Sequence, residues 1–208
     1  MSQVAYLPVG KREQTKAANR RSILDAAREV FGELGYESAT VRDIIRRTGL
    51  SVGAFYNYYR SKEEVFEALA DDGARRFRPL LRAAYDNADG FETYVRGAIQ
   101  AYFDFLADEH ENWQARRPAG ERQPHTQVQT PEMAAVFDEI RDALAEVMER
   151  GDAPRVDPDY LAVACIAVSR EIGEKMLQRR PIDTRAAADF AVALILGGVA
   201  ALPRLYAD

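Results

Sequence analysis

The chain has little of what disulfide-linked, metal-binding or redox proteins use. Its 208 residues include one cysteine, Cys165, and only two histidines. A single cysteine excludes an internal disulfide framework, and no cysteine and histidine residues have the spacing of a zinc site. We therefore expect no metal, no cofactor and a chain suited to the reducing cytoplasm.

Long hydrophobic stretches are missing as well. The longest apolar run covers residues 190–202, which is 13 residues, whereas a membrane-spanning helix needs about 20. No basic segment followed by an apolar stretch stands near the start, so we expect no signal peptide. The run is better explained as a buried or interface helix.

The usual arrangements of catalytic residues are also absent from the sequence. Neither His110 nor His125 has a suitably spaced partner, Cys165 lies in an apolar segment, and no glycine-rich segment suits a phosphate. Both histidines stand in or beside a polar segment, and we expect them to be solvated. The sequence therefore argues against an enzyme.

What the chain does have is a core-forming composition and an uneven charge. Apolar residues make up 47% and charged residues 29% of the chain, as in a folded domain. The net charge of −5 divides into +5 over residues 1–62 and −10 over the remainder. A basic segment joined to an acidic body is typical of a DNA-binding module with a second functional part, although chance distribution of solvated charges is the alternative.

Apolar residues recur at helical spacing along most of the chain, and no segment alternates as a β-strand does. We expect an all-α fold of about nine helices. The longer ones are predicted at about 15–34, 61–84, 91–109, 131–150, 158–177 and 184–205, with a polar loop over 110–130. Pro79 either bends the second of these helices or ends it.

Residues 40–59 have the pattern of two short helices around a tight turn. Thr40 and Asp43 have capping-box spacing at the start of the first helix. Gly49 supplies the turn conformation, and Ser51 can cap the second helix. This order is that of a helix-turn-helix motif, whose second helix enters the DNA major groove. A second capping box is expected at Ser61 and Glu64, at the start of the next helix.

At these residues the sequence resembles the tetracycline-repressor (TetR) family of bacterial transcriptional regulators. The matching residues are Thr40, Ile44, Gly49, Ser51, Gly53, Phe55, Tyr56, Tyr58, Ser61, Lys62 and Glu63. Departures are mild, such as Ile45 and Thr48 at positions where alanine is usual. The resemblance is specific over about residues 15–70. It implies an N-terminal arm (1–14), a helix-turn-helix domain (15–62) and a helical domain for effector binding and dimerisation (63–208).

The resemblance implies that Thr40, Arg42, Tyr56 and Lys62 contact phosphates of double-stranded operator DNA. Lys62 also stands near a helix N-terminus, which favours anions. A half-buried core position is the alternative for each tyrosine taken alone.

Base contacts are predicted from the side chains of the second short helix. Gly53 and Ala54 lack bulk, so this helix can approach the groove closely, and Val52 can touch a thymine methyl group. Asn57 suits adenine, whereas Phe55 and Tyr59 are expected to pack inward. The predicted DNA-binding residues are Thr40, Arg42, Ser51, Val52, Gly53, Ala54, Tyr56, Asn57, Tyr58 and Lys62.

The resemblance further implies a homodimer interface and a pocket for a small-molecule effector. For the interface we predict Val168, Ile172, Phe190, Leu194, Gly197 and Gly198, on helices that are apolar over much of their circumference. For the pocket we predict Tyr94, Tyr102, Phe105, Trp113, Met133, Phe137, Ile140 and Cys165. An ordinary apolar core is the alternative for this second set.

Taken together, the sequence predicts a homodimeric repressor that a small apolar or aromatic effector releases from a pseudo-palindromic operator. We expect the effector to act through the helix that begins near Ser61. An activator, or a DNA-binding regulator without a ligand, is the alternative. A helical interaction module that does not bind DNA is a third possibility, disfavoured by Gly53, Tyr56 and Lys62 together.

Overall fold

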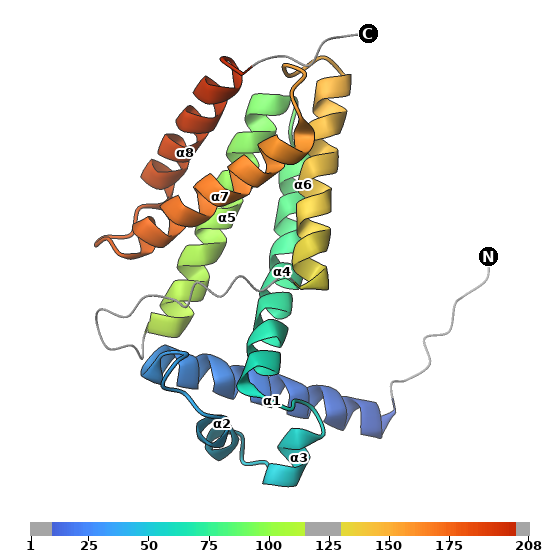
Figure 1. Cartoon of the computed structure of the whole chain (residues 1–208), viewed down its shortest axis with the longest axis vertical. Coiled ribbons are helices and arrows are strands. Elements are labelled where there is room, and N and C mark those ends of the chain that lie inside the picture. The colour runs from blue at the N-terminus through green and yellow to red at the C-terminus, as the bar shows by residue number, and fades with distance from the viewer. Residues whose placement is uncertain (1–9, 115–129, 203–208) are drawn as a thin grey trace, which may run out of the picture. The chain divides into compact units, whose positions relative to one another are not determined.

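The computed structural model describes residues 10–114 and 130–202, except for the side chains of residues 111–114. Over these ranges the chain is all-α, as predicted, with eight helices where about nine were expected. They are α1 (Lys11–Leu34), α2 (Val41–Thr48), α3 (Val52–Tyr56), α4 (Lys62–Asp86), α5 (Phe91–Gln114), α6 (Pro131–Glu149), α7 (Pro158–Leu177) and α8 (Thr184–Val199), as Figure 1 shows. The described residues form two compact units that divide within α4 after Leu69, and each unit is considered separately.

Three helix ends differ from the predictions. α1 begins at Lys11 rather than near residue 15. α5 continues to Gln114, so residues 110–114 belong to the helix rather than to the expected loop. His110, expected to be solvated, is instead buried, because the added turn carries it inward, whereas His125 lies outside the described residues. α8 ends at Val199, short of the predicted end near residue 205, which also lies outside them.

The start of α4 and its passage through Pro79 follow from local hydrogen bonding. The Glu64 amide donates to Ser61 Oγ (3.2 Å), and the Glu64 carboxylate accepts from the Arg60 amide (2.7 Å), one residue before the expected position. The alternative that the helix ends near Pro79 is wrong, because α4 is continuous across it. Pro79 is exposed, and as a proline it donates no backbone hydrogen bond to the preceding turn.

The first unit packs α1, α2, α3 and the start of α4 around one small apolar core. α1 packs directly against α2. The side chains that are fully buried or nearly so come from all four helices, and include Ile23, Val30, Ile44, Phe55 and Val65. Because α3 has only five residues, its place depends on Phe55 filling this core rather than on helix propensity.

The two short helices are fixed by the predicted caps. Both halves of the capping box between Thr40 and Asp43 are present. Gly49 ends α2 in the left-handed conformation, at φ +68°, which a side chain would resist. Ser51 Oγ accepts from the Ala54 amide (3.2 Å) and so begins α3.

Asp43→Ala is expected to lower the free energy of unfolding by about 1 kcal/mol, because it removes half of the capping box. The Thr40 hydroxyl, and after it the Arg46 guanidinium, hold the pKa of the Asp43 carboxyl below its usual value. The stabilisation is therefore present above the carboxyl's ordinary pKa and is lost as the pH falls through the lower pKa of the folded state.

Urea unfolding of this variant and the wild type, from about pH 7 towards about pH 3, measures the effect. A difference between the two proteins that does not shrink on acidification would contradict the role assigned to the charged carboxylate.

The second unit contains the rest of α4 and helices α5 to α8. α7 packs against both α6 and α8. It also approaches α5 closely at Gly173, where an added Cβ would lie 2.6 Å from Leu106 Cδ1 and 3.3 Å from the Phe103 ring. A larger residue at position 173 would therefore require Leu106 and the Phe103 ring to shift at the α5–α7 contact.

Within the second unit, α4 and α6 are joined by polar contacts along one face. Three carboxylates of α6 stand seven residues apart, at Glu132, Glu139 and Glu146. Arg78 and Arg82 of α4 both donate to Glu139 Oε1 at 2.6 Å, and Arg78 lies 3.8 Å from Glu132. Tyr85 donates to Glu146. A seven-residue interval is about two helical turns, so all three carboxylates face α4.

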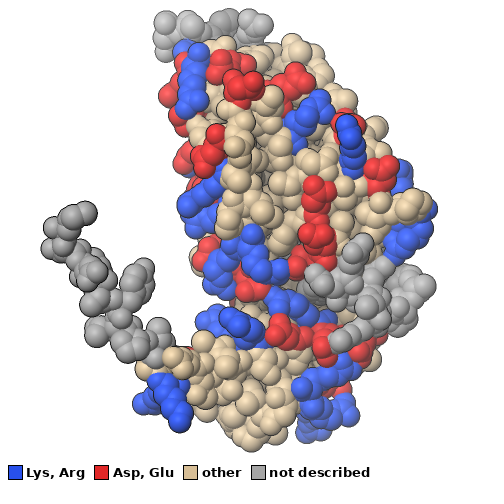
Figure 2. Space-filling view, turned by 180° about the vertical axis from the view of Figure 1, so that it is seen from behind, with Lys and Arg blue, Asp and Glu red and all other residues tan. Residues whose placement is uncertain are grey.

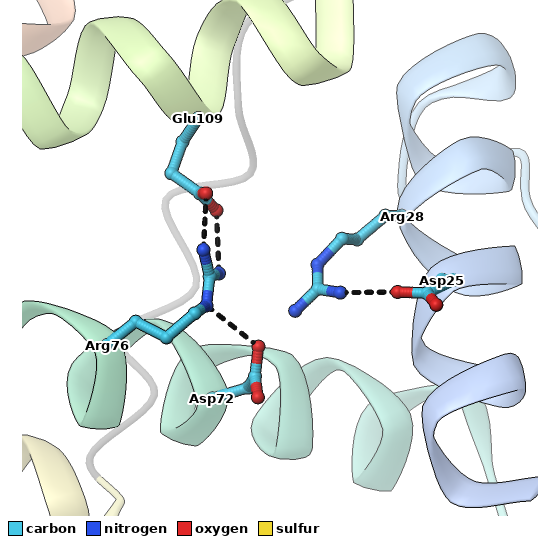
Figure 3. Close-up of polar contacts among 5 residues, drawn as sticks. All are labelled: Asp25, Arg28, Asp72, Arg76 and Glu109. Atoms are coloured by element: carbon cyan, nitrogen blue, oxygen red, sulfur yellow. Dashed lines mark hydrogen bonds and ion pairs between the residues drawn. The ribbon is translucent and has the colours of Figure 1, made fainter. Parts of the chain in front are cut away.

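Other ion pairs fix the helices of each unit. Figure 3 shows Arg76 of α4 bound to Asp72 one turn earlier (3.1 Å) and to Glu109 of α5 (2.8 Å). In the first unit, Arg28 of α1 pairs with Asp25 (2.7 Å). Since these side chains are partly exposed, each pair contributes modestly to stability.

Glu139→Gln is expected to lower the free energy of unfolding by about 1 kcal/mol, because the amide keeps the shape but loses the charge that pairs with Arg78 and Arg82. The loss should shrink at high salt, which screens partly exposed pairs. Glu149→Gln, at an exposed position of the same helix, is the matched control. Urea unfolding at low and high salt checks this, and equal losses for the two variants would exclude a special role for Glu139.

Candidate nucleic-acid interface

The predicted DNA-binding residues lie on the first unit, around α2 and α3. Val52 is 58% exposed and Tyr56 is 50% exposed. Thr40, Arg42, Ser51, Gly53 and Asn57 are exposed as well, and Ala54, Tyr58 and Lys62 are half-buried. Phe55 and Tyr59 are buried, which confirms that they pack inward. α3 therefore presents one side to solvent while its other side holds it on the core.

The surface in front of α3 is open at Gly53. A Cβ placed there would meet no protein atom within 4 Å. The fold therefore does not need a glycine at this position. The absence of a side chain instead leaves room for a close approach by another molecule.

Two side chains of α1 hold the segment that follows α3. Asn19 donates to the Tyr58 hydroxyl (3.2 Å), and Arg20 Nε donates to the Tyr59 hydroxyl (3.1 Å). These contacts could not be predicted from the sequence, since the partners lie 39 residues apart. A hydroxyl that accepts one hydrogen bond still has its own proton to donate, so Tyr58 keeps a donor for a phosphate or a base.

A third contact ties α2 to α1. Arg47 donates to Glu29 (3.1 Å) and to Glu33 (3.0 Å), and these bonds raise the pKa of its guanidinium. This arginine is thus engaged within the fold. The predicted phosphate contact Arg42 lies on the same helix and is exposed.

Lys62 has a position that the sequence did not suggest. Its ammonium donates to the carbonyl oxygens of Tyr36 (3.0 Å), Glu37 (3.3 Å) and Ala39 (3.4 Å). It also lies 4.5 Å from the centre of the Tyr36 ring. Its predicted phosphate contact stays a prediction, and these bonds give it a second possible role that is developed below.

The charge of the first unit suits a polyanion. On the face shown in Figure 2, the first unit has an uncharged centre, with Lys and Arg side chains on both sides and some Asp and Glu side chains beside them. An uncharged surface with cations beside it suits DNA recognition, because bases are read in the groove and phosphates are neutralised next to it.

The predicted effector-pocket residues come together in the core of the second unit, with two exceptions. Tyr94 is buried, and Tyr102, Phe105, Phe137, Ile140 and Cys165 pack around the same cluster. Met133 is 43% exposed and does not belong to that cluster. The side chain of Trp113 lies outside the described residues. The remaining six residues thus pack in or against one apolar cluster.

Burial keeps the polar groups of this cluster neutral. It raises the pKa of Tyr102 to about 12 and that of the Cys165 thiol to about 11, and it raises the pKa of Tyr94 as well. The cluster therefore offers neutral hydroxyl and thiol groups within apolar surroundings, with the Arg76 guanidinium 5.6 Å from the centre of the Phe105 ring.

An exposed apolar surface covers α7 and α8. On α8, Phe190 is 64% and Leu194 52% exposed, and Gly197 and Gly198 are exposed beside them. Val168 and Ile172 of α7, predicted for the same interface, are half-buried and pack on the core of their own unit. The outer side of α7 instead carries Tyr160 (77% exposed) and Val163 (54% exposed), which the sequence analysis did not single out. The outer sides of α7 and α8 therefore both expose large apolar side chains.

Within residues 10–110 and 130–202, no three His, Cys, Asp or Glu side chains gather as metal ligands. None of the described helices combines the length and apolar character that a membrane span requires.

The helix-turn-helix unit, with its exposed second helix and basic border, defines a DNA-binding regulator. Residues 23–69 match the sequence profile of the bacterial regulatory proteins of the tetR family. The chain is also 30% identical over 191 residues to the HTH-type transcriptional activator FasR of Mycolicibacterium smegmatis, covering 88% of this chain and 84% of the relative. The chain therefore belongs to the TetR family of DNA-binding transcriptional regulators and is not an enzyme.

Other similar proteins agree with this assignment. The HTH-type transcriptional repressor Rv1474c of Mycobacterium tuberculosis is 39% identical over 97 residues, which is 46% of this chain and about half (49%) of that relative. The solved structure of the transcriptional regulator FadR from Bacillus subtilis, in complex with stearoyl-CoA, has the same fold, with a TM-score of 0.68. It is 18% identical to the chain, and the match covers 86% of this chain and 98% of that one.

Proposed function

We propose that the protein is a homodimeric, cytoplasmic repressor that binds a pseudo-palindromic operator and is released from it by a small apolar ligand. The observation that carries the DNA-binding part is α3, which exposes Val52, Gly53 and Tyr56 while Phe55 anchors it. One such helix makes few base contacts, so tight and specific binding requires two copies on a two-fold symmetric site.

The dimer part rests on the surface formed by Phe190, Leu194, Gly197 and Gly198, extended by Tyr160 and Val163. Monomeric proteins rarely expose so much apolar surface on adjacent helices. Small residues let facing helices approach closely, and two helices from each copy would form a four-helix contact. A second copy of the chain is the occupant we propose, because an isologous contact also places two recognition helices on one duplex.

The effector part rests on the interior cluster around Tyr94 and Tyr102. Its apolar and aromatic side chains favour a ligand with a hydrophobic body, and its neutral hydroxyls favour hydrogen bonds over ion pairs. The stearoyl chain of the stearoyl-CoA bound to the FadR structure is a hydrophobic body of that kind, whereas its coenzyme A part is anionic, and we take long-chain acyl compounds as the first class to test.

The proposed response passes along α4, whose first turns belong to one unit and whose later turns belong to the other. A ligand that separates α4 from α6 would have to break the bonds of Arg78 and Arg82 to Glu139. A ligand shifts this equilibrium only by its difference in affinity for the two states.

The proposal is tested with the DNA upstream of the protein's own gene and with random duplex. Fluorescence anisotropy titrations over a range of salt concentrations measure affinity and its salt dependence. Acyl-CoA esters of increasing chain length, free coenzyme A and free fatty acids are then added. Release of the operator by long-chain esters but not by coenzyme A supports the proposal. Absence of salt-sensitive binding to any duplex would refute it.

An activator is the second candidate, because the relative that covers most of the chain is an activator. Transcription of the adjacent promoter in vitro, with and without the protein, separates the two possibilities. The repressor proposal fails if added protein raises the transcript level.

A further inference from the structure

The Lys62 ammonium is surrounded by backbone hydrogen-bond acceptors. Three carbonyl oxygens, of Tyr36, Glu37 and Ala39, accept from it at 3.0–3.4 Å. An ammonium has three N–H donors, so these bonds use all of them. The face of the Tyr36 ring, 4.5 Å from Nζ, adds a cation–π contact.

The Tyr36 ring that contacts the ammonium is itself held by neighbouring side chains. The Tyr36 ring lies 4.9 Å from the Phe66 ring and 5.4 Å from the Phe31 ring, measured between centroids. Its hydroxyl donates to Glu63 Oε1 (3.3 Å). The ammonium therefore joins the start of α4 to a loop that already packs on α1 and α4.

The carbonyls belong to the segment that leads into α2. Ala39 is 2% exposed, and the next residue, Thr40, is the N-cap of α2. Because Ala39 directly precedes the cap, the position of its carbonyl sets where α2 begins. Thr40 and Arg42, two of the proposed phosphate contacts, follow within the first turn.

We infer that Lys62 is a positioning residue for DNA binding, which holds the α1–α2 loop and thereby the N-terminus of α2, rather than a phosphate ligand. A phosphate could bind this ammonium only by displacing a carbonyl oxygen. The inference rests on the proposed function, because it presupposes that the start of α2 contacts DNA.

Three variants of the full-length protein test this. Lys62→Met keeps the length of the side chain and removes the charge. Lys62→Arg keeps the charge, but a planar guanidinium cannot donate to the three carbonyl oxygens with the geometry of the ammonium. Arg42→Met is the matched control, since it removes an exposed cation of the same surface.

For Lys62→Met we expect a melting temperature lower by about 3–8 °C, because several charge-assisted hydrogen bonds are lost. Amide hydrogen exchange of residues 39–43 should become faster in the DNA-free protein. At a temperature where the variant is fully folded, operator affinity should fall about tenfold or more, with the wild-type slope of log K against log salt. In Lys62→Arg we expect none of the melting temperature, the exchange rates and the operator affinity to return fully to the wild-type value. Arg42→Met should instead reduce the slope by about 0.9 for each protomer bound and leave exchange unchanged.

Three results would overturn the inference. One is a reduced salt slope for Lys62→Met together with full recovery in Lys62→Arg, which is the behaviour of a phosphate ligand. Another is unchanged hydrogen exchange at residues 39–43. The third is a lower melting temperature with unchanged operator affinity of the folded variant, which indicates a structural role only.

If Lys62→Met does not fold, Lys62→Arg decides alone, by whether its exchange and affinity are those of the wild type. If the wild type itself binds no duplex, the proposed function fails, whereas the exchange result still reports on the loop.

Discussion

Gly53→Glu is expected to abolish operator binding and to leave the fold intact. A side chain at this position meets no protein atom within 4 Å, and glutamate favours a helix more than glycine does. The melting temperature should therefore stay the same or rise. On DNA, however, a carboxylate at the centre of α3 would stand in the groove between two rows of phosphates, so we expect affinity to fall by about 100-fold or more.

The measurement is an anisotropy titration of operator DNA, with thermal unfolding of the same preparation. Gly90→Glu is the matched control, because it makes the same change at another glycine with no neighbour within 4 Å. It should bind operator as the wild type does. Undiminished binding by Gly53→Glu would exclude α3 as the recognition helix.

Leu194→Arg is expected to convert the dimer into monomers and to weaken operator binding by about 100-fold or more. Leu194 is 52% exposed in the isolated chain, so an arginine there is tolerated by the monomer. In the proposed dimer the same side chain would be buried, and an unpaired charge buried at a contact is strongly destabilising. A monomer reaches one half-site only, and so loses the contacts of the second.

Size-exclusion chromatography with light scattering measures the mass, and the operator titration measures the consequence. Leu80→Arg is the control, because Leu80 of α4 is similarly exposed (43%) and lies outside the proposed interface. A dimeric Leu194→Arg protein would place the interface elsewhere. If only Leu80→Arg dissociates, α4 rather than α8 forms the contact.

The helix-turn-helix unit was predictable because its signals are local. The capping box at Thr40, the left-handed Gly49 and the cap at Ser51 each fix the backbone within four residues of themselves, and the structure has all three. The inward packing of Phe55 and Tyr59 followed from the same register. Family membership depended on many such residues in one order.

The predictions failed where long-range packing decides. α5 runs to Gln114, past the expected end, and His110 within it is buried although the segment is polar in composition. Val168 and Ile172 of α7 are half-buried against the core of their own unit, and their place in the interface stays a prediction. Helical periodicity alone does not tell which apolar side of a helix meets its own core and which meets another molecule.

The sequence by itself determined the class of protein, since the caps, the turn glycine and the apolar spacing act through neighbouring residues and leave little freedom to the rest of the fold. The tertiary structure alone decided what each long side chain does. Lys62 meets carbonyls 23–26 residues away, Asn19 and Arg20 meet tyrosines 39 residues away, and Glu139 meets two arginines of α4 about 60 residues before it. Such partners are brought together by the folding of the core, and no spacing along the chain records them.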